Sequence, residues 1–488
     1  MADKEILVIK MNNKAVINNF LWRFLERIGV QGVNFIVSII VARIVAPEVY
    51  GIVALVTIFT TIMQVFIDSG LGTALIQKKN ADDLDFSTVF YFNLLMCVAL
   101  YGVMYLLAPF IASFYEIPQL TKIVRVLSIT LIVSGVRGIQ QSYVSKKLQF
   151  KKFFFSTLGA TLFSAVVGIY MAYKGYGVWA LVGQTVSSNV VGTIILWITV
   201  EWRPKWMFSF SRLKGLFSYG WKLLVSALID TVYREIRSLI IGKRYSSESL
   251  AFYNKGQQFP KLLVDNINTS IDSVLLPTMS NEQENKERVK MMTRRAIKTG
   301  TYIIAPLMIG LAAVAEPFIE LLLTSKWLFC VPFLRIFCLT YMIYPIHTAN
   351  LNAIKAMGRS DMFLKLEIIK KIIGIIALAA TMMISVEAMA YSLLGTTVIG
   401  SFVNAFPNKK LLNYSYLEQI KDIAPSLVLC AVMGFLVYSV KFLGFSSIIT
   451  LFVQIPLGAA IYIIGSKLFR LESFNYALST VKNYLRKG

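Results

Sequence analysis

The run VFYFNLLMCVALYGVMYLLAPFIASFY, residues 89–115, contains no charged side chain and is long enough to cross a bilayer as one helix. A helix needs about 20 predominantly apolar residues to span the hydrocarbon core, and by this rule the chain holds about fourteen spans. Their approximate centres are Gly32, Phe59, Ala99, Leu131, Leu162, Val186, Ser226, Val264, Ile304, Thr340, Ile373, Thr396, Leu429 and Phe452. The sequence therefore predicts an all-α polytopic membrane protein, with an unusually polar seventh and eighth span.

The composition agrees with this fold class. Of 488 residues, 56% are hydrophobic and only 15% are charged, whereas a soluble domain carries about 25% charged residues. The loops are too short for a separate catalytic domain, and no phosphate-binding loop, HExxH, paired CxxC or GxSxG motif occurs. We therefore predict a protein that is not an enzyme and has no metal or organic cofactor. The four cysteines lie in apolar runs and are expected to be small buried residues: Cys97, Cys330, Cys338 and Cys430.

The formal net charge of +23 has three candidate explanations. In a soluble protein it would indicate nucleic acid as a partner, which the hydropathy argues against. In a membrane protein, cytoplasmic loops collect Lys and Arg, and anionic lipid attracts them. A cationic substrate path is the third explanation, and it stays open beside the second.

The charged loops alternate along the chain, which predicts the orientation. The basic set contains Lys78, Lys79, Lys146, Lys147, Lys151, Lys152, Arg203, Lys205, Arg212, Lys214, Lys286, Arg288, Lys290, Arg294, Arg295, Lys355, Arg359, Lys409 and Lys410. The other set holds little except Lys243 and Arg244. The basic set should face the cytoplasm, so both termini are expected on the cytoplasmic side of the membrane.

The two halves of the chain resemble each other at an offset of roughly 200 residues, as transporter repeats do. APEVYGIVAL follows the first span and SSESLAFYNK the seventh; LAPFI leaves the third and AEPFI the ninth. The repeat predicts a six-helix lobe over 1–206, a second over 207–412, and two extra helices with a basic tail over 413–488. Both lobes start inside, so they are parallel repeats, and a cleft is expected between them.

Polar residues follow steps of three and four along the repeat-related spans, which places them on one helix face. Ionisable groups at membrane depth are costly and usually face a watery cavity. The cationic candidates for substrate binding are Arg27, Arg137, Lys222, Arg234, Arg237, Lys255 and Lys261. The neutral lining candidates are Gln31, Asn34, Gln64, Asn254, Gln258 and Asn268. Arg suits phosphate oxygens in particular.

Two other interpretations of these rows of polar residues stay open. Asp230 with Arg234, and Lys261 with Asp265, are spaced to pair on their own helices and could only hold the lobes together. The acidic candidates for coupling to H⁺ or Na⁺ are Asp68, Asp230, Asp265 and Asp272, and His347 could be a protonation switch or a satisfied structural histidine.

Four segments carry a family resemblance. They are VARIVAPEVYGIVAL (41–55), FIDSGLGTALIQKK (66–79), LIIGKRYSSESLAFYNKGQQFPKL (239–262) and VLLPTMS (274–280). These segments resemble the polysaccharide and O-antigen flippases of the multidrug/oligosaccharidyl-lipid/polysaccharide exporter superfamily, in the colanic-acid-exporter-like branch.

The resemblance implies two six-helix lobes around a cationic cavity, and alternating access driven by an ion gradient. It also implies an undecaprenyl-pyrophosphate-linked oligosaccharide as substrate, with other polysaccharide-assembly proteins as candidate partners and no nucleic acid. The basic lumen of the family then corresponds by position to Arg27, Arg137, Lys222, Arg234, Arg237 and Lys255. Two alternatives remain: an ion-coupled drug or metabolite antiporter of the same superfamily, and a membrane glycan polymerase or ligase.

Overall fold

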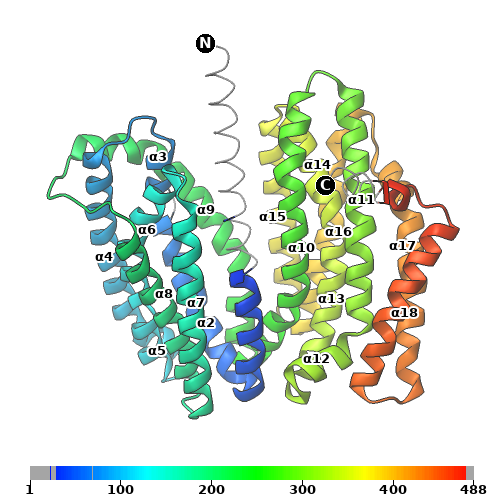
Figure 1. Cartoon of the computed structure of the whole chain (residues 1–488), viewed down its shortest axis with the longest axis horizontal. Helices are drawn as coiled ribbons and strands as arrows, with labels where there is room; N and C mark the ends of the chain where they lie inside the picture. The colour runs from blue at the N-terminus through cyan, green and yellow to red at the C-terminus, as the bar shows by residue number, and fades with distance from the viewer. Residues whose placement is uncertain (1–21, 23–28, 69, 477, 480–488) are drawn as a thin grey trace. The chain divides into compact units, whose positions relative to one another are not determined.

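The computed structural model describes Trp22 and residues 29–68, 70–476 and 478–479, and within these residues the chain is helical, without a strand. An apolar helix covers Gly29–Ile44. The elements that follow it are α2 (Pro47–Asp68), α3 (Leu71–Gln77), α4 (Asp83–Tyr115), α5 (Leu120–Leu127), α6 (Ile129–Lys146), α7 (Phe150–Tyr173), α8 (Val178–Thr199), α9 (Phe210–Arg244), α10 (Ser247–Asn281), α11 (Lys286–Ala313), α12 (Ala315–Leu323), the 3₁₀ helix η1 (Ser325–Cys330), α13 (Val331–Met342), α14 (Tyr344–Ala356), α15 (Ser360–Thr381), α16 (Val386–Leu412), α17 (Tyr416–Ser439), η2 (Val440–Leu443) and α18 (Ser447–Leu468) (Figure 1).

Ten helical segments of the described chain are long and apolar enough to cross a membrane. The all-α polytopic fold class is therefore confirmed. The remaining four expected spans are the helix over Gly29–Ile44, which is apolar but shorter, and the long helices α9, α10 and α15, which fall outside the ten. Fourteen helices are thus available for fourteen spans, and the exact span count stays a prediction.

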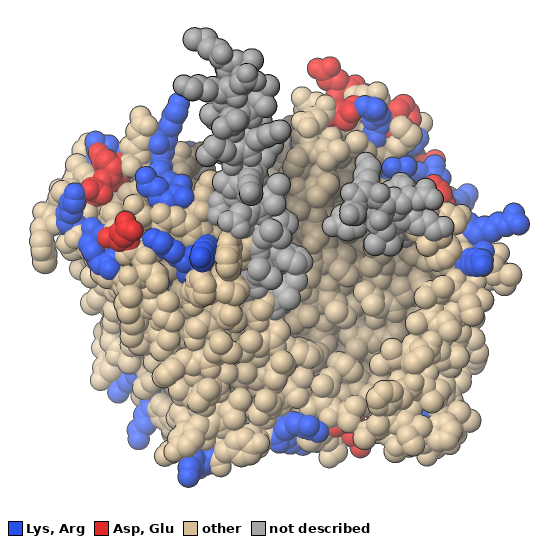
Figure 2. All heavy atoms as spheres, viewed as in Figure 1, with Lys and Arg blue, Asp and Glu red and all other residues tan. Residues whose placement is uncertain are grey.

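The outer faces of the helices suit lipid. Large apolar side chains such as Phe110, Ile198, Phe435 and Phe452 are more than 70% exposed, which would be unfavourable in water but matches a hydrocarbon solvent. On the face drawn in Figure 2, the charged side chains of each unit gather at its two ends, with a broad band of uncharged side chains between them. The four cysteines are buried free thiols, as predicted.

The chain forms two compact units, Met1–Ala251 and Phe252–Gly488, so that α9 belongs to the first unit and most of α10 to the second. The lobes over 1–206 and 207–412 rest on the sequence repeat and stay a prediction. The fourth and tenth expected spans, which the repeat pairs, are each interrupted once, at Ser128 and at Ile343.

In the first unit, α7 packs along α8, α4 along α6, and α9 along α2. A buried cluster around Leu75, Val89, Ile139 and Leu196 joins α3, α4, α6, α7, α8 and α9. Small residues allow the backbones to approach closely: a Cβ on Gly51 of α2 would overlap the backbone of Ser247, at the start of α10. The close contact between α2 and the start of α10 therefore requires glycine at position 51.

One buried carboxylate organises the start of α4. Asp85 is 0% exposed and pairs with Lys78 at 2.6 Å and with Arg212 of α9 at 3.5 Å. Its side chain also completes a reciprocal capping box with Asp82, which satisfies backbone N–H groups at the helix start. This Asp85 cluster connects the end of α3, the start of α4 and α9.

In the second unit, α11 packs against α13, α14 and α17, and α17 packs along α18. A buried amide network joins two of these elements, α14 and α17, to α16. Asn350 of α14 and Gln419 of α17 bond to each other at 2.8 and 3.0 Å, and Asn408 of α16 donates to the Asn350 Oδ1 at 2.7 Å. Tyr462 of α18 donates to the Tyr302 carbonyl of α11 at 2.8 Å. The last two helices are thus fixed to this unit by hydrogen bonds as well as apolar contact.

Candidate functional site

A row of charged side chains follows α9 in the first unit. Lys222, Asp230 and Arg234 lie to either side of the middle of this helix, and Arg237 follows one turn later. Lys222 is exposed, and the Arg234 side chain is 66% exposed. α9 is one of the expected spans, and exposed charges near the middle of a helix that crosses a membrane are stable only beside water or a charged ligand. This face of α9 is therefore a candidate for a hydrophilic surface.

The expected pair between Asp230 and Arg234 is present, with a separation of 3.3 Å. Its two side chains are 46% and 66% exposed, and ion pairs this exposed contribute about 0–1 kcal/mol. The pair therefore contributes little to the stability of the fold. This favours a binding role over a structural role for the charged row of α9.

A second polar row follows α10 in the other unit. Lys261, Asp265 and Asp272 are exposed, while Asn254 and Gln258 are half-buried. No ion pair joins Lys261 to Asp265 in the described part of the chain, so the spacing alone does not produce that bond. Asp272 accepts a hydrogen bond from Asn352 of α14 at 2.5 Å. Asn268 is buried, and its Oδ1 has no hydrogen bond among the described residues.

Two of the cationic candidates lie in packed surroundings. Arg137 of α6 contacts the position where a Cβ on Gly192 of α8 would stand, at 3.2 Å. Lys255 is only 5% exposed, and its Nζ lies 5.5 Å from the ring centre of Trp327. Both side chains contribute to helix packing in their own units, and their role in substrate binding stays a prediction.

The first expected span is described only in part. Arg27 lies outside the described residues. Gln31 is half-buried and Asn34 is exposed. Further along, Gln64 of α2 donates from Nε2 to the Asp68 Oδ1 at 2.9 Å, so these two candidates are in direct contact.

Asp68 borders a small polar cavity inside the first unit. The cavity has a volume of about 170 Å³ and is lined by α2, α3, α4 and α6, with Asp68, Thr73, Asn93, Gln141, Ser142 and Ser145 among its residues. Carboxylate, amide and hydroxyl oxygens are suitable partners for a hard monovalent cation or a hydrated proton. The structure thus places one of the acidic candidates, Asp68, at a cavity of this kind.

His347 has both ring nitrogens in hydrogen bonds. Asn404 donates from Nδ2 to the His347 Nδ1 at 2.8 Å, and Nε2 lies 3.1 Å from the Thr397 carbonyl oxygen. An amide N–H at one nitrogen and a carbonyl at the other select the neutral Nε2–H tautomer. This arrangement matches the structural reading of His347, and a coupling role stays a prediction.

Several polar groups escaped the sequence reasoning. The Asp85 cluster could have been suspected from the run ADDLDF, residues 81–86, because an acidic residue three positions after another is a capping signal. The network of Asn350, Asn408 and Gln419 carries no comparable signal, since its partners lie 58 and 69 residues apart. An apolar groove beside α9, described below, also has no motif.

The sequence profile of a family described as polysaccharide biosynthesis proteins matches residues 40–332. The succinoglycan biosynthesis transport protein ExoT of Rhizobium meliloti (strain 1021) is 23% identical over 417 residues, which cover 86% of this chain and 83% of ExoT. The teichuronic acid biosynthesis protein TuaB of Bacillus subtilis (strain 168) is 27% identical over 310 residues, or 62% of this chain, and the match spans 63% of TuaB.

Among solved structures, the lipid II flippase MurJ in its inward closed conformation superposes with a TM-score of 0.74. The match covers 93% of this chain and 98% of MurJ at 18% sequence identity, so the likeness shows a common fold. The relatives named for an activity are a transport protein and a flippase rather than enzymes, as expected. With the family profile matching well over half of its length, this chain belongs to the family of polysaccharide biosynthesis proteins.

Proposed function

We propose that this protein is a secondary transporter that moves an undecaprenyl-pyrophosphate-linked oligosaccharide across the bacterial cytoplasmic membrane by alternating access. The exported glycan would enter O-antigen, capsule or exopolysaccharide. Family membership, the transport function named for ExoT and the MurJ-like fold support the class of activity. Because the basic loops alternate with weakly charged ones and basic loops face the cytoplasm, we place both termini in the cytoplasm.

The exposed cationic row of α9 is the observation that carries the substrate assignment. Lys222 and Arg234 are exposed within a 35-residue helix of a membrane protein. Because guanidinium and ammonium groups bind phosphate oxygens through charge-assisted hydrogen bonds, the pyrophosphate of the lipid carrier binds along this row. The neutral Gln, Asn, Ser and Thr side chains accommodate sugars of varied composition.

Binding of a fluorescent polyprenyl-pyrophosphate oligosaccharide to the purified protein in nanodiscs tests this assignment. Lys222→Gln and Arg237→Gln are expected to weaken binding about tenfold each, since each removes one charge-assisted bond. The matched control is Lys122→Gln, an exposed cation of α5 away from this row. Equal affinity in all four proteins would contradict a cationic substrate site, and uptake of a small cation by the same proteins would favour the antiporter.

We further propose that H⁺ or Na⁺ couples to transport at the cavity of Asp68. The cavity places one carboxylate among amide and hydroxyl side chains, and Gln64 orients that carboxylate. Asp68→Asn keeps the shape and removes the charge, so it is expected to abolish stimulation by an ion gradient while substrate binding persists. Asp83→Asn, at the exposed start of α4, is the control. Undiminished stimulation in Asp68→Asn would exclude this cavity as the coupling site.

A further inference from the structure

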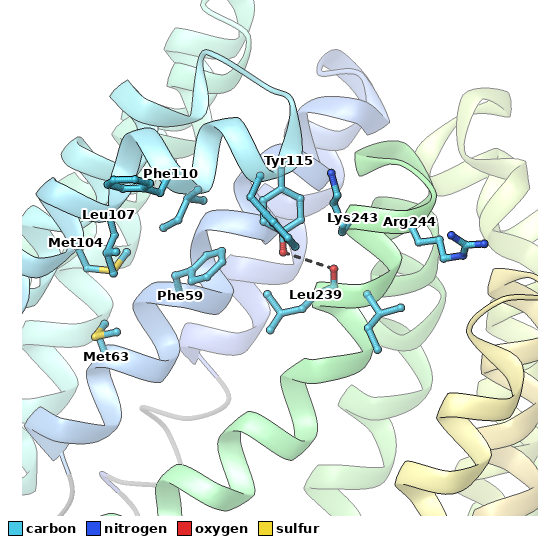
Figure 3. A pocket seen from close by; sticks show the side chains of 12 residues that line it. Phe59, Met63, Met104, Leu107, Phe110, Tyr115, Leu239, Lys243 and Arg244 are labelled. Carbon is cyan, nitrogen blue, oxygen red and sulfur yellow. Dashed lines mark hydrogen bonds between the residues drawn. The ribbon is translucent and has the colours of Figure 1, made fainter.

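A long apolar groove lies on the first unit, between α2, α4 and α9 (Figure 3). Its volume is about 630 Å³, and its walls are almost wholly apolar, formed by Phe59, Met63, Leu107, Phe110, Tyr115 and Leu239. Phe59 and Tyr115 meet edge to face at 6.3 Å, and the Tyr115 hydroxyl reaches the Leu239 carbonyl at 3.5 Å, which holds the three helices around the groove. The groove belongs to neither the polar row of α9 nor the Asp68 cavity.

Charged groups stand at one end of this groove only. Lys243 and Arg244, the last two residues of α9, are among its lining residues. Lys243 lies beside Tyr115 (Figure 3). Its Nζ also lies 5.0 Å from the ring centre of Phe114. The groove is therefore amphipathic along its length, with an apolar body and a cationic end.

The carboxylate nearest to this end is Glu116, which follows α4. Its Oε1 accepts a hydrogen bond from the Lys243 Nζ at 2.9 Å. That hydrogen bond and the positive charge of Lys243 lower the pKa of Glu116, which keeps this exposed group ionised at neutral pH. Two cations and one carboxylate leave a single positive charge in excess at the end of the groove.

We propose that this groove binds a resident anionic phospholipid, with one acyl chain along the apolar walls and its phosphodiester against Lys243 and Arg244. The excess of one positive charge matches the single negative charge of a phosphodiester lipid such as phosphatidylglycerol. A pyrophosphate carries more negative charge than this end can neutralise. The volume also lies in the range of about 300–1,000 Å³ that is typical of sites for one small ligand, too little to enclose a 55-carbon polyprenyl chain. This lipid is therefore distinct from the transported substrate.

Native mass spectrometry of the full chain tests the proposal after exchange into equal amounts of phosphatidylglycerol and phosphatidylcholine. The wild type is expected to retain one phosphatidylglycerol in preference to phosphatidylcholine. Each basic residue near a membrane surface changes the binding of anionic lipid about fivefold, so Lys243→Gln combined with Arg244→Gln should reduce the preference at least that much. Glu116→Gln removes the carboxylate that pairs with Lys243, so it should raise the preference for phosphatidylglycerol. Lys122→Gln is the matched control, expected to behave as the wild type.

A steric variant tests the apolar body of the groove independently of its charged end. Leu107→Trp fills the groove without changing charge and should lower retention of both lipids, and a thermal unfolding curve of each variant establishes that it is folded. The proposal would be overturned if the double variant kept the wild-type preference for phosphatidylglycerol, or if Lys122→Gln lost that preference to the same extent. Equal retention of phosphatidylcholine and phosphatidylglycerol by the wild type would also overturn it. Displacement of the bound phosphatidylglycerol by undecaprenyl phosphate would overturn it as well, by assigning the groove to the carrier lipid. None of these results depends on whether the protein flips its substrate.

Discussion

Asp85 is the carboxylate whose loss should cost this protein most among the acidic residues at the start of α4. It is fully buried and accepts from Lys78 at 2.7 and 2.6 Å. Removing one partner of a buried pair leaves the other charge uncompensated, at a cost of about 3–5 kcal/mol. Asp85→Ala should therefore lower the thermal unfolding temperature in detergent strongly, and trap part of the protein in an unfolded form.

The adjacent carboxylate supplies the control. Asp83 pairs with Lys205 at 2.5 Å, but both side chains are about half exposed. Exposed pairs contribute about 0–1 kcal/mol, so Asp83→Ala should unfold close to the wild-type temperature. If the two variants lose equal stability, burial does not decide the strength of these pairs.

For His347, we predict that substitution changes the stability of the protein but not the pH dependence of transport. Both ring nitrogens are engaged by Asn404 and Thr397. His347→Gln can keep part of this bonding, so it should cost about 1 kcal/mol of stability. The pH profile of transport should be that of the wild type. A profile shifted in His347→Gln, with Asp68→Asn unshifted, would show that the histidine is the protonation switch.

At this scale the sequence indicated which residues are polar, but not how each one is surrounded. Helical spacing correctly grouped Lys222, Asp230 and Arg234 on one helix, and the structure leaves them exposed. Lys255 was named as a cationic candidate because it lacks a local partner in sequence and corresponds to the family's basic lumen, yet it is buried against Trp327. Its burial depends on a ring 72 positions further along the chain, which periodicity within one helix cannot report.

Among the helices, the glycine of α2 that faces the start of α10 should tolerate no side chain. A Cβ on Gly51 would overlap the Ser247 backbone, whereas a Cβ on Gly102 of α4 meets nothing within 4 Å. Gly51→Ala should therefore reduce the yield of folded protein severely. Gly102→Ala should be neutral or stabilising by up to about 1 kcal/mol, because alanine favours the helix. Size-exclusion profiles and unfolding temperatures of the two variants compare them, and equal yields would mean that α2 can move away at little cost.

The apolar length rule located the long helices and passed over the short ones. Ten expected spans coincide with long apolar helical segments. The short elements α3, α12 and η1 were not predicted, because a helix of nine residues or fewer is too short to leave an apolar signature of its own. The same rule placed the polar seventh and eighth spans, and the structure has the long helices α9 and α10 there. Both fall outside the ten apolar segments, so their crossing of the membrane stays a prediction.

For the whole molecule, the fold class and family could be read from the sequence, whereas the six-helix lobes over 1–206 and 207–412 stay a prediction. The four segments that carry the resemblance, between residues 41 and 280, all lie within the family match over residues 40–332. The compact units meet at Ala251, within α10. A repeat in sequence reports common ancestry of two segments, whereas compactness depends on which helices pack together, and α9 packs along α2.

The central claim is that this chain flips a lipid-linked oligosaccharide, and reconstitution into liposomes tests it most directly. A fluorescent polyprenyl-pyrophosphate oligosaccharide is placed in both leaflets, and an outer quencher reports its crossing with and without a gradient of H⁺ or Na⁺. We predict crossing that depends on the gradient, is lost in Arg237→Ala, and is unchanged in Lys122→Gln. A folded protein that binds the labelled lipid but does not move it faster than empty liposomes would contradict the claim.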